Sequence, residues 1–126
     1  MAEQKALIIE NDLFFTSKIT NTVKEVGLAP VIAQESKAVN QQLKDPDLSL
    51  IIIDLSLNGL DTLKLLNNVK GSQSTCHIPI IAFAEHTEKE LLQGAREAGC
   101  EIVITNLGIA KDLKDLIEAA LPEPSL

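Results

Sequence analysis

Five short apolar runs, separated by longer segments with helical periodicity, are the feature that most constrains the fold of this chain. The runs cover residues 6–9, 30–33, 48–53, 78–84 and 101–105, and each is too short to be a typical helix. Strands that alternate with helices favour a parallel sheet, because parallel neighbours need a crossover connection. The run Ile51–Ile53 has no polar alternation, which indicates a central strand that is covered on both faces. We therefore predict an α/β fold, a doubly wound (βα)5 three-layer sandwich around a five-stranded parallel sheet.

Capping residues and glycines predict where the helices begin and end. The expected helices cover residues 13–26 before Gly27, residues 37–44 after a Ser36 cap, residues 60–70 before Gly71, residues 87–99 ending at Gly99, and a last helix that stops at Pro122. Thr87 and Glu90 have the spacing of a capping box for the fourth helix. Asp12, directly before the first helix, suits an N-cap.

Length, composition and charge favour one domain that lies in the cytoplasm. The chain has 126 residues, 45% of them apolar, which is enough for a single core. The net charge of -7 is spread along the chain and argues against direct contact with nucleic acid or an anionic membrane. Neither a signal peptide nor a spanning segment is evident in the sequence. We expect a domain over residues 1–121 and a tail or the start of a linker over residues 122–126.

The cysteines and histidines show no spacing typical of a metal or redox site. Cys76 and Cys100 are far apart and do not form a C-x-x-C motif, so we expect two reduced thiols. A metal site built from both cysteines with His77 and His86 would need a convergence in space that no motif indicates.

Two acidic residues follow predicted strands and indicate where a functional site lies. Glu10 closes the first strand in IIEND, and Asp54 closes the third in IIIDLSLNG. Ligands of doubly wound sheets bind beyond the carboxyl ends of the strands, so both carboxylates should emerge at the same rim. Asp54 then has two interpretations, a reactive carboxylate or a solvent-facing group that only caps a loop.

The strand and helix order, IIEND and IIIDLSLNG together resemble the receiver domain of bacterial two-component response regulators, over nearly the whole chain. The resemblance implies a flavodoxin-like sheet of order 2-1-3-4-5 and a signalling domain that is not an enzyme. It implies that Asp54 accepts a phosphoryl group, and that Glu10, Asn11 and Asp54 occupy the positions that hold Mg²⁺. No other cofactor is implied.

Several positions depart from the family pattern. Asn11 stands where a second acid is usual, Ala84 where a switch hydroxyl ends the fourth strand, and Asn106 where a lysine ends the fifth. Val103 replaces an aromatic residue, and Asp12 is a substitute metal ligand only if it is not the helix cap. These changes predict reduced Mg²⁺ affinity and an atypical receiver or pseudo-receiver. We expect Asn11 and Asn106 to hydrogen-bond to Asp54 and to hold its side chain in one position.

Three functions remain open from the sequence. The first is an atypical receiver that contacts a histidine kinase or another signalling protein through the face Glu88–Leu121, as a monomer or weak homodimer. The second is an interaction scaffold that works without phosphorylation. The third is a small flavodoxin-like enzyme, which is disfavoured because the chain has no G-x-G-x-x-G motif, no P-loop and no Trp or Tyr to stack on a flavin.

Overall fold

The computed structural model describes residues 3–122 and has the predicted alternation of strands and helices. In chain order the elements are β1 (Lys5–Ile9), α1 (Leu13–Glu25), β2 (Ala29–Ala33), α2 (Ser36–Gln42), β3 (Leu48–Asp54), α3 (Thr62–Gly71), β4 (Ile80–Ala84), α4 (Lys89–Ala98), β5 (Ile102–Thr105) and α5 (Asn106–Ala120). The five strands form one parallel sheet of order 2-1-3-4-5, which confirms the expected doubly wound topology. Residues 123–126, most of the predicted tail, lie outside the described residues.

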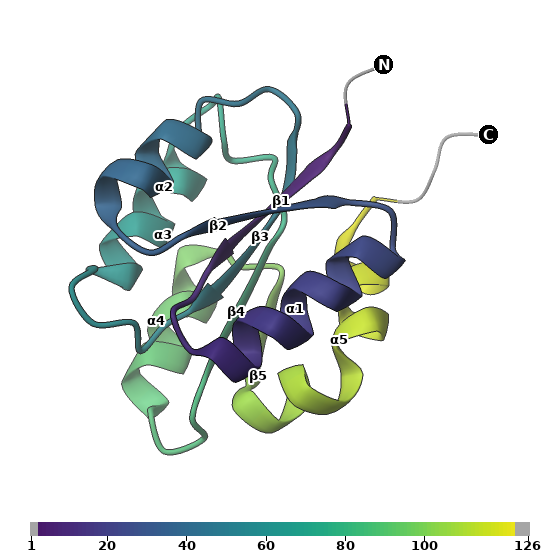
Figure 1. Cartoon of the computed structure of the whole chain (residues 1–126). Coiled ribbons are helices and arrows are strands. Elements are labelled where there is room, and N and C mark those ends of the chain that lie inside the picture. Colours follow the sequence, from purple (N-terminus) through teal and green to yellow (C-terminus); the bar gives the residue numbers. More distant parts are fainter. Residues whose placement is uncertain (1–2, 123–126) are drawn as a thin grey trace.

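Helices cover both faces of the sheet, with α1 and α5 on one side and α2, α3 and α4 on the other (Figure 1). Each face has its own apolar core. The core under α1 and α5 is built from Ala6, Ile8, Ile19, Val23, Leu50, Ile52, Ile81, Phe83, Ile109, Leu113 and Ile117. The opposite core includes Leu7, Ile9, Val39, Ile51, Ile53, Leu66, Val69, Ala82, Leu92 and Ala95. Alternate residues of β1 and β3 thus serve opposite cores, as the pleat of a strand requires.

Strand β3 is the central strand that the isoleucine run predicted. Ile51 is 2% exposed, and Ile52 and Ile53 are fully buried. The strand pairs with β1 on one edge and with β4 on the other. Because Ile9 is the register partner of Ile53, the residues that follow them, Glu10 and Asp54, leave the sheet side by side. The fold therefore brings the two predicted carboxylates to one rim.

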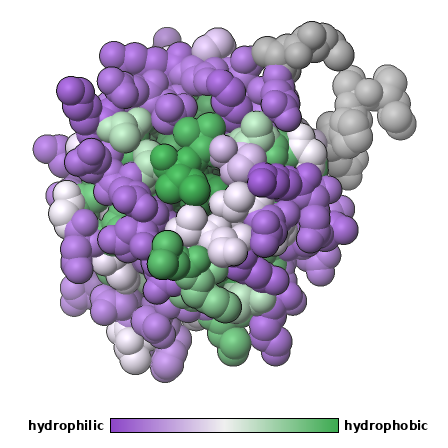
Figure 2. Space-filling model, in the orientation of Figure 1, coloured by the Kyte–Doolittle hydropathy of each residue, from purple (hydrophilic) through white to green (hydrophobic). Residues whose placement is uncertain are grey.

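Strand β2 is an edge strand with an apolar surface. It crosses the front of the molecule in Figure 1, and Figure 2 shows hydrophobic surface over it within a mostly hydrophilic face. Ile32 in this strand is 45% exposed. Pro30 pairs with Ala6 of β1 and has no N–H, which suits an edge where no further strand follows.

The helix ends confirm one predicted cap and correct two others. The Asp12 side chain accepts a hydrogen bond from Phe15 N, 3.2 Å away, and is the N-cap of α1 as predicted. The prediction for Ser36 was wrong, because it is already the first residue of α2 and Glu35 precedes it as the cap. The capping box at Thr87 was also wrong, since α4 begins at Lys89 and its cap makes no side-chain hydrogen bond. For α4, a turn closed by Glu88 N and Glu85 O, 3.0 Å apart, precedes the helix.

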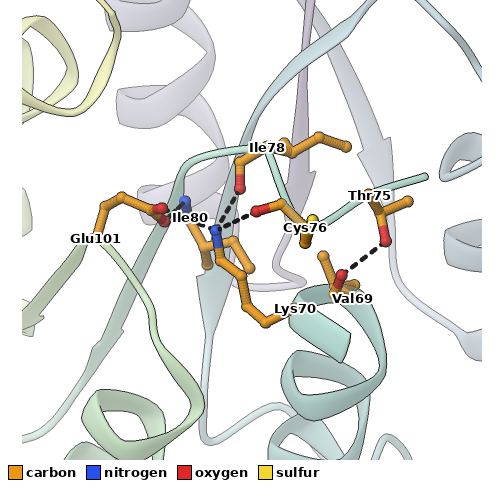
Figure 3. Close-up of polar contacts among 7 residues, drawn as sticks. All are labelled: Val69, Lys70, Thr75, Cys76, Ile78, Ile80 and Glu101. Carbon is orange, nitrogen blue, oxygen red and sulfur yellow. Dashed lines mark hydrogen bonds and ion pairs between the residues drawn. The ribbon is translucent and has the colours of Figure 1, made fainter. Parts of the chain in front are cut away.

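Lys70, near the end of α3, connects three segments through its ammonium group (Figure 3). Its Nζ donates to the carbonyl oxygens of Cys76 and Ile78, at 3.2 and 2.8 Å, and pairs with Glu101 Oε2 at 2.8 Å. The other oxygen of Glu101 accepts from Ile80 N at 2.8 Å, so one carboxylate also caps the start of β4. The Lys70 side chain is only 11% exposed. This network holds the loop before β4 against the start of β5.

The expectations about the cysteines and about membrane spans can be compared with the structure. Cys76 and Cys100 are both free thiols. Burial raises the pKa of Cys100 to about 11, and the negative charge of Glu101 adds to the shift, so this thiol stays protonated at neutral pH. Within residues 3–122, no helix has the length and apolar character needed to cross a membrane.

Replacing Lys70 with methionine should lower the free energy of unfolding by about 2 kcal/mol, because two carbonyls and Glu101 lose a charged donor that is largely shielded from water. Urea unfolding measures the change. Lys64 on the same helix is exposed, and its side chain makes no hydrogen bond within the described residues, so Lys64→Met is the matched control. Equal effects of the two substitutions would contradict the role given to Lys70.

Candidate functional site

The candidate site lies at the rim formed by the carboxyl ends of the strands. Glu10 follows β1, Asp54 ends β3, and Ala84 and Thr105 end β4 and β5. Ala84 and Thr105 are register partners, as are Ile9 and Ile53. The rim is therefore a row of residues that follow neighbouring strands.

Glu10 is fully buried although it is a carboxylic acid. Its Oε1 accepts hydrogen bonds from its own turn, from Asn11 N at 2.8 Å and from Asp12 N at 3.2 Å. Its Oε2 is buried and has no partner when the group is ionised. A protonated Glu10 can instead donate to Asp54, the neighbouring carboxylate. Glu10 thus has one anchored oxygen and one oxygen that is available to a proton or a cation.

The pKa of Glu10 is raised to about 7, chiefly by burial, and the hydrogen bond and negative charge of Asp54 add to the shift. The backbone N–H groups of Asn11 and Asp12 oppose this shift because they stabilise the ionised form. At neutral pH the carboxyl is close to its midpoint. Near pH 7 the Glu10 carboxyl therefore holds about half a proton on average, if no cation neutralises it.

Asp54 is half-buried and its orientation is fixed by the turn that follows it. Its Oδ1 accepts from Ser56 N at 2.9 Å. Leu55 and Leu57 are buried and anchor the turn to the core, and the Thr62 hydroxyl donates to Leu55 O at 2.8 Å. The segment after β3 is thus held firmly, and the carboxylate is presented at the rim by a rigid support.

Asn11 and Asp12 stand at the turn between β1 and α1, and both are exposed. Asp12 uses its carboxylate to cap α1, so it is committed to the helix rather than to the rim. The Asn11 side chain makes no hydrogen bond to Asp54 within the described residues, and the predicted contact between these two side chains was wrong. The Asn11 amide remains the nearest neutral oxygen donor in sequence to Glu10.

The predicted switch positions are occupied by side chains that belong to the core. Ala84 is fully buried at the end of β4 and carries no hydroxyl. Val103 is half-buried in β5 and packs against the core under α2, α3 and α4. Thr87 lies exposed in the loop before α4 and forms no hydrogen bond among the described side chains. The hydroxyl-bearing residue beside Ala84 along the rim is Thr105, its register partner at the end of β5.

Asn106 is the first residue of α5, and its side chain contacts Glu85 instead of Asp54. The Nδ2 group donates to Glu85 Oε1 at 3.0 Å, which corrects the prediction that Asn106 bonds to Asp54. Sequence reasoning missed Glu85. The register could have indicated it, because Glu85 and Asn106 directly follow the paired residues Ala84 and Thr105.

The arrangement offers oxygen donors that suit a hard divalent cation. Glu10 Oε2 is buried without a partner, and the Asp54 carboxylate lies beside it. Mg²⁺ prefers oxygen ligands and keeps several waters, so a site with two carboxylates and an amide oxygen fits its chemistry. Among residues 3–122, no three His, Cys, Asp or Glu side chains are grouped to hold a metal. The rim therefore provides two acidic groups where three would make a stronger site.

Comparison with known proteins identifies relatives of one kind. The family model described as the response regulator receiver domain matches residues 6–118. The phosphate regulon transcriptional regulatory protein PhoB of Escherichia coli is 24% identical over 118 residues, which are 94% of this chain and 52% of PhoB. The chain thus spans about half the length of the curated relatives that it matches first.

Solved structures share the fold at low sequence identity. The receiver domain of NtrX from Brucella abortus superposes with a TM-score of 0.81, at 21% identity, and covers 93% of this chain and 98% of that one. The receiver domain of a sensor histidine kinase from Pseudomonas aeruginosa, with a magnesium ion coordinated in its active site cleft, has a TM-score of 0.77 at 17% identity, with 94% and 98% coverage.

Replacing Glu10 with glutamine should remove a pH dependence of stability. The folded state binds a proton with a pKa of about 7 where an ordinary glutamate has 4.5, so the wild-type protein holds a proton that the unfolded chain releases in this window. Without divalent cations, the free energy of unfolding of the wild type should therefore fall relative to Glu10→Gln as the pH rises from about 4.5 to about 7. The fall should be on the order of 1–3 kcal/mol. Parallel curves for the two proteins in chelator would contradict the assignment.

Proposed function

Because the chain belongs to the response regulator receiver domain family of two-component signalling, we propose that it is an atypical receiver in which Asp54 accepts the phosphoryl group. The observation that carries the proposal is the presentation of Asp54 at the end of a buried central strand, beside the buried acid Glu10. Ser56 N fixes one Asp54 oxygen and thereby orients the carboxylate.

The proposed reaction is transfer of a phosphoryl group to the carboxylate. An Asp54 oxygen forms a bond to phosphorus, and the bond from phosphorus to the donor atom breaks, with its electron pair leaving on the donor. The product is an acyl phosphate. Both reacting groups are anionic, so their approach requires positive charge at the rim. Glu10 loses its proton, or stays ionised, when such charge is present.

A bound Mg²⁺ would supply that positive charge and draw the phosphoryl oxygens toward the rim. Glu10 and Asp54 would hold it with their carboxylates, and Asn11 would add a neutral amide oxygen. The solved Pseudomonas receiver with magnesium in its cleft supports this assignment by likeness of fold. We expect reduced affinity here, because Asn11 brings no charge and the proton on Glu10 competes with the cation.

The remaining machinery for conversion of the phosphoryl group into a shape change is weakened in this chain. Ala84 has no hydroxyl to bond the new phosphoryl oxygen. Asn106 can donate a hydrogen bond but carries no positive charge, and its donor group already bonds Glu85. A charge-assisted hydrogen bond is roughly twice as strong as a neutral one, so replacement of a cation weakens the hold on a phosphoryl group.

Signalling then depends chiefly on protein contacts. We assign these to the face Glu88–Leu121, which includes α4, β5 and α5, with a histidine kinase or another signalling protein as partner. Strand β5 is the second edge of the sheet and its residues are half-buried. Leu107 at the start of α5 is 67% exposed, a large apolar side chain that a partner can cover. A scaffold that acts without phosphorylation would use the same face.

Addition of Mg²⁺ and beryllofluoride should shift the amide NMR signals of residues 10–12 and 54–57, because the mimic occupies the acceptor carboxylate. Signals over residues 88–121 should move little, since Ala84 and Asn106 provide weak coupling. Acetyl phosphate should add one phosphoryl group by mass, and Asp54→Asn should abolish both effects.

The control for chemistry at a second carboxylate is Asp61→Asn, which removes an exposed acid that caps α3. It should leave acceptance unchanged. If the wild type shows no response even at high Mg²⁺, Asp54 is not an acceptor, and the scaffold interpretation replaces the phosphorelay.

A further inference from the structure

The hydrogen bond between Asn106 and Glu85 joins two elements at the end of the sheet. It extends the pairing of β4 with β5 by one step, since its residues directly follow the partners Ala84 and Thr105. Figure 1 shows the loop from β4 to α4 and the first turn of α5 at the same lower edge of the molecule. This side-chain hydrogen bond therefore connects the loop after β4 to the first turn of α5.

Only one orientation of the Asn106 amide serves this bond. A carboxylate at neutral pH accepts hydrogen bonds but does not donate, so the amide nitrogen must face Glu85. The amide oxygen is then directed to the buried side, where it has no partner. A buried acceptor without a donor is unfavourable.

The helix end of this bond cannot easily move. Helix α5 begins directly after β5, with Thr105 as its cap and Asn106 as its first residue. A Cβ on Gly108 would clash with the side chain of Ile104, so the first turn is packed tightly against the end of β5. The other partner, Glu85, is exposed and lies in a turn that Glu88 N closes by donating to Glu85 O at 3.0 Å. The helix is the fixed partner, and the loop is the element that is held.

We propose that Glu85 is a positioning residue that captures the side chain at position 106, fastens the loop 85–88 to α5, and keeps position 106 away from Asp54. The loop is then restrained in one arrangement whatever the state of the rim. A lysine at position 106 would pair with Glu85 for the same reason, because the acid lies nearer to its attachment point than Asp54 does along the row of strand ends. We call the hydrogen bond between Glu85 and the side chain at position 106 the latch. The consequence of the latch for Asp54 rests on the proposed function, whereas the restraint of loop 85–88 does not.

Amide hydrogen exchange tests the latch without phosphoryl chemistry. Glu85→Ala should speed exchange in residues 85–88 by about threefold to tenfold, whereas Glu85→Gln should stay near wild type because its amide oxygen still accepts from Asn106. His86→Ala, another exposed side chain in the same loop, is the control and should have little effect. Equal exchange in wild type and Glu85→Ala would overturn the latch.

Affinity for beryllofluoride with Mg²⁺ tests the consequence for Asp54. Asn106→Lys alone should bind within about twofold of wild type, because Glu85 captures the lysine, and the double variant with Glu85→Ala should bind at least about tenfold more tightly. If the single lysine variant gains as much as the double, Glu85 does not capture position 106 and the proposal is wrong. If no variant binds the mimic, acceptance by Asp54 fails, and hydrogen exchange alone then decides the latch.

Discussion

Two carboxyl groups at the ends of adjacent parallel strands, one of them fully buried, are the constraint on which the rim depends. The pairing of β1 with β3 places Glu10 beside Asp54, and the two cores beneath the sheet leave no freedom for either strand to shift. A one-residue slip would turn every isoleucine of β3 to the wrong face. The acids therefore meet because the apolar pattern requires this register, and their electrostatic conflict follows from the fold. Burial of Glu10, with a smaller contribution from the neighbouring Asp54, raises its pKa to about 7.

That conflict is informative about function. A buried acid with an unpartnered oxygen opposes stability unless a proton or a cation satisfies it. The half of the rim formed by Glu10 and Asp54 has this character, and it is the half to which the proposed function assigns phosphoryl acceptance. The other half, at the ends of β4 and β5, has changed chemistry, with a buried methyl group at Ala84 and a neutral amide bound to Glu85. Under the proposed function, acceptance and response would be separable, because residues that follow different strands would carry them.

The order of elements, the central position of β3 and the meeting of Glu10 with Asp54 could all be predicted from the sequence, because apolar periodicity determines which segments are buried. The Asp12 cap was predictable for a local reason, since its acceptor lies three residues from its donor. Contacts between side chains that are far apart in the sequence could not be predicted in this way. Asn106 was expected at Asp54, and its choice of Glu85 depends on how α5 begins without a loop.

Helix starts and the Lys70 network show the same limit of local patterns. Thr87 has the spacing of a cap, yet the turn at residues 85–88 delays α4 to Lys89. Lys70 and Glu101 are 31 residues apart, and no sequence pattern links them. Such contacts arise only when the sheet brings distant segments together.

The claim that Glu10 and Asp54 share one rim is tested most directly by the carboxyl carbon NMR signal of Glu10, followed across pH in the absence of divalent cations. In the wild type it should titrate with a midpoint near the pKa of about 7. In Asp54→Asn the midpoint should fall but stay above that of an ordinary glutamate, because burial persists while the neighbouring charge is gone. A Glu10 midpoint that is the same in both proteins would contradict the account.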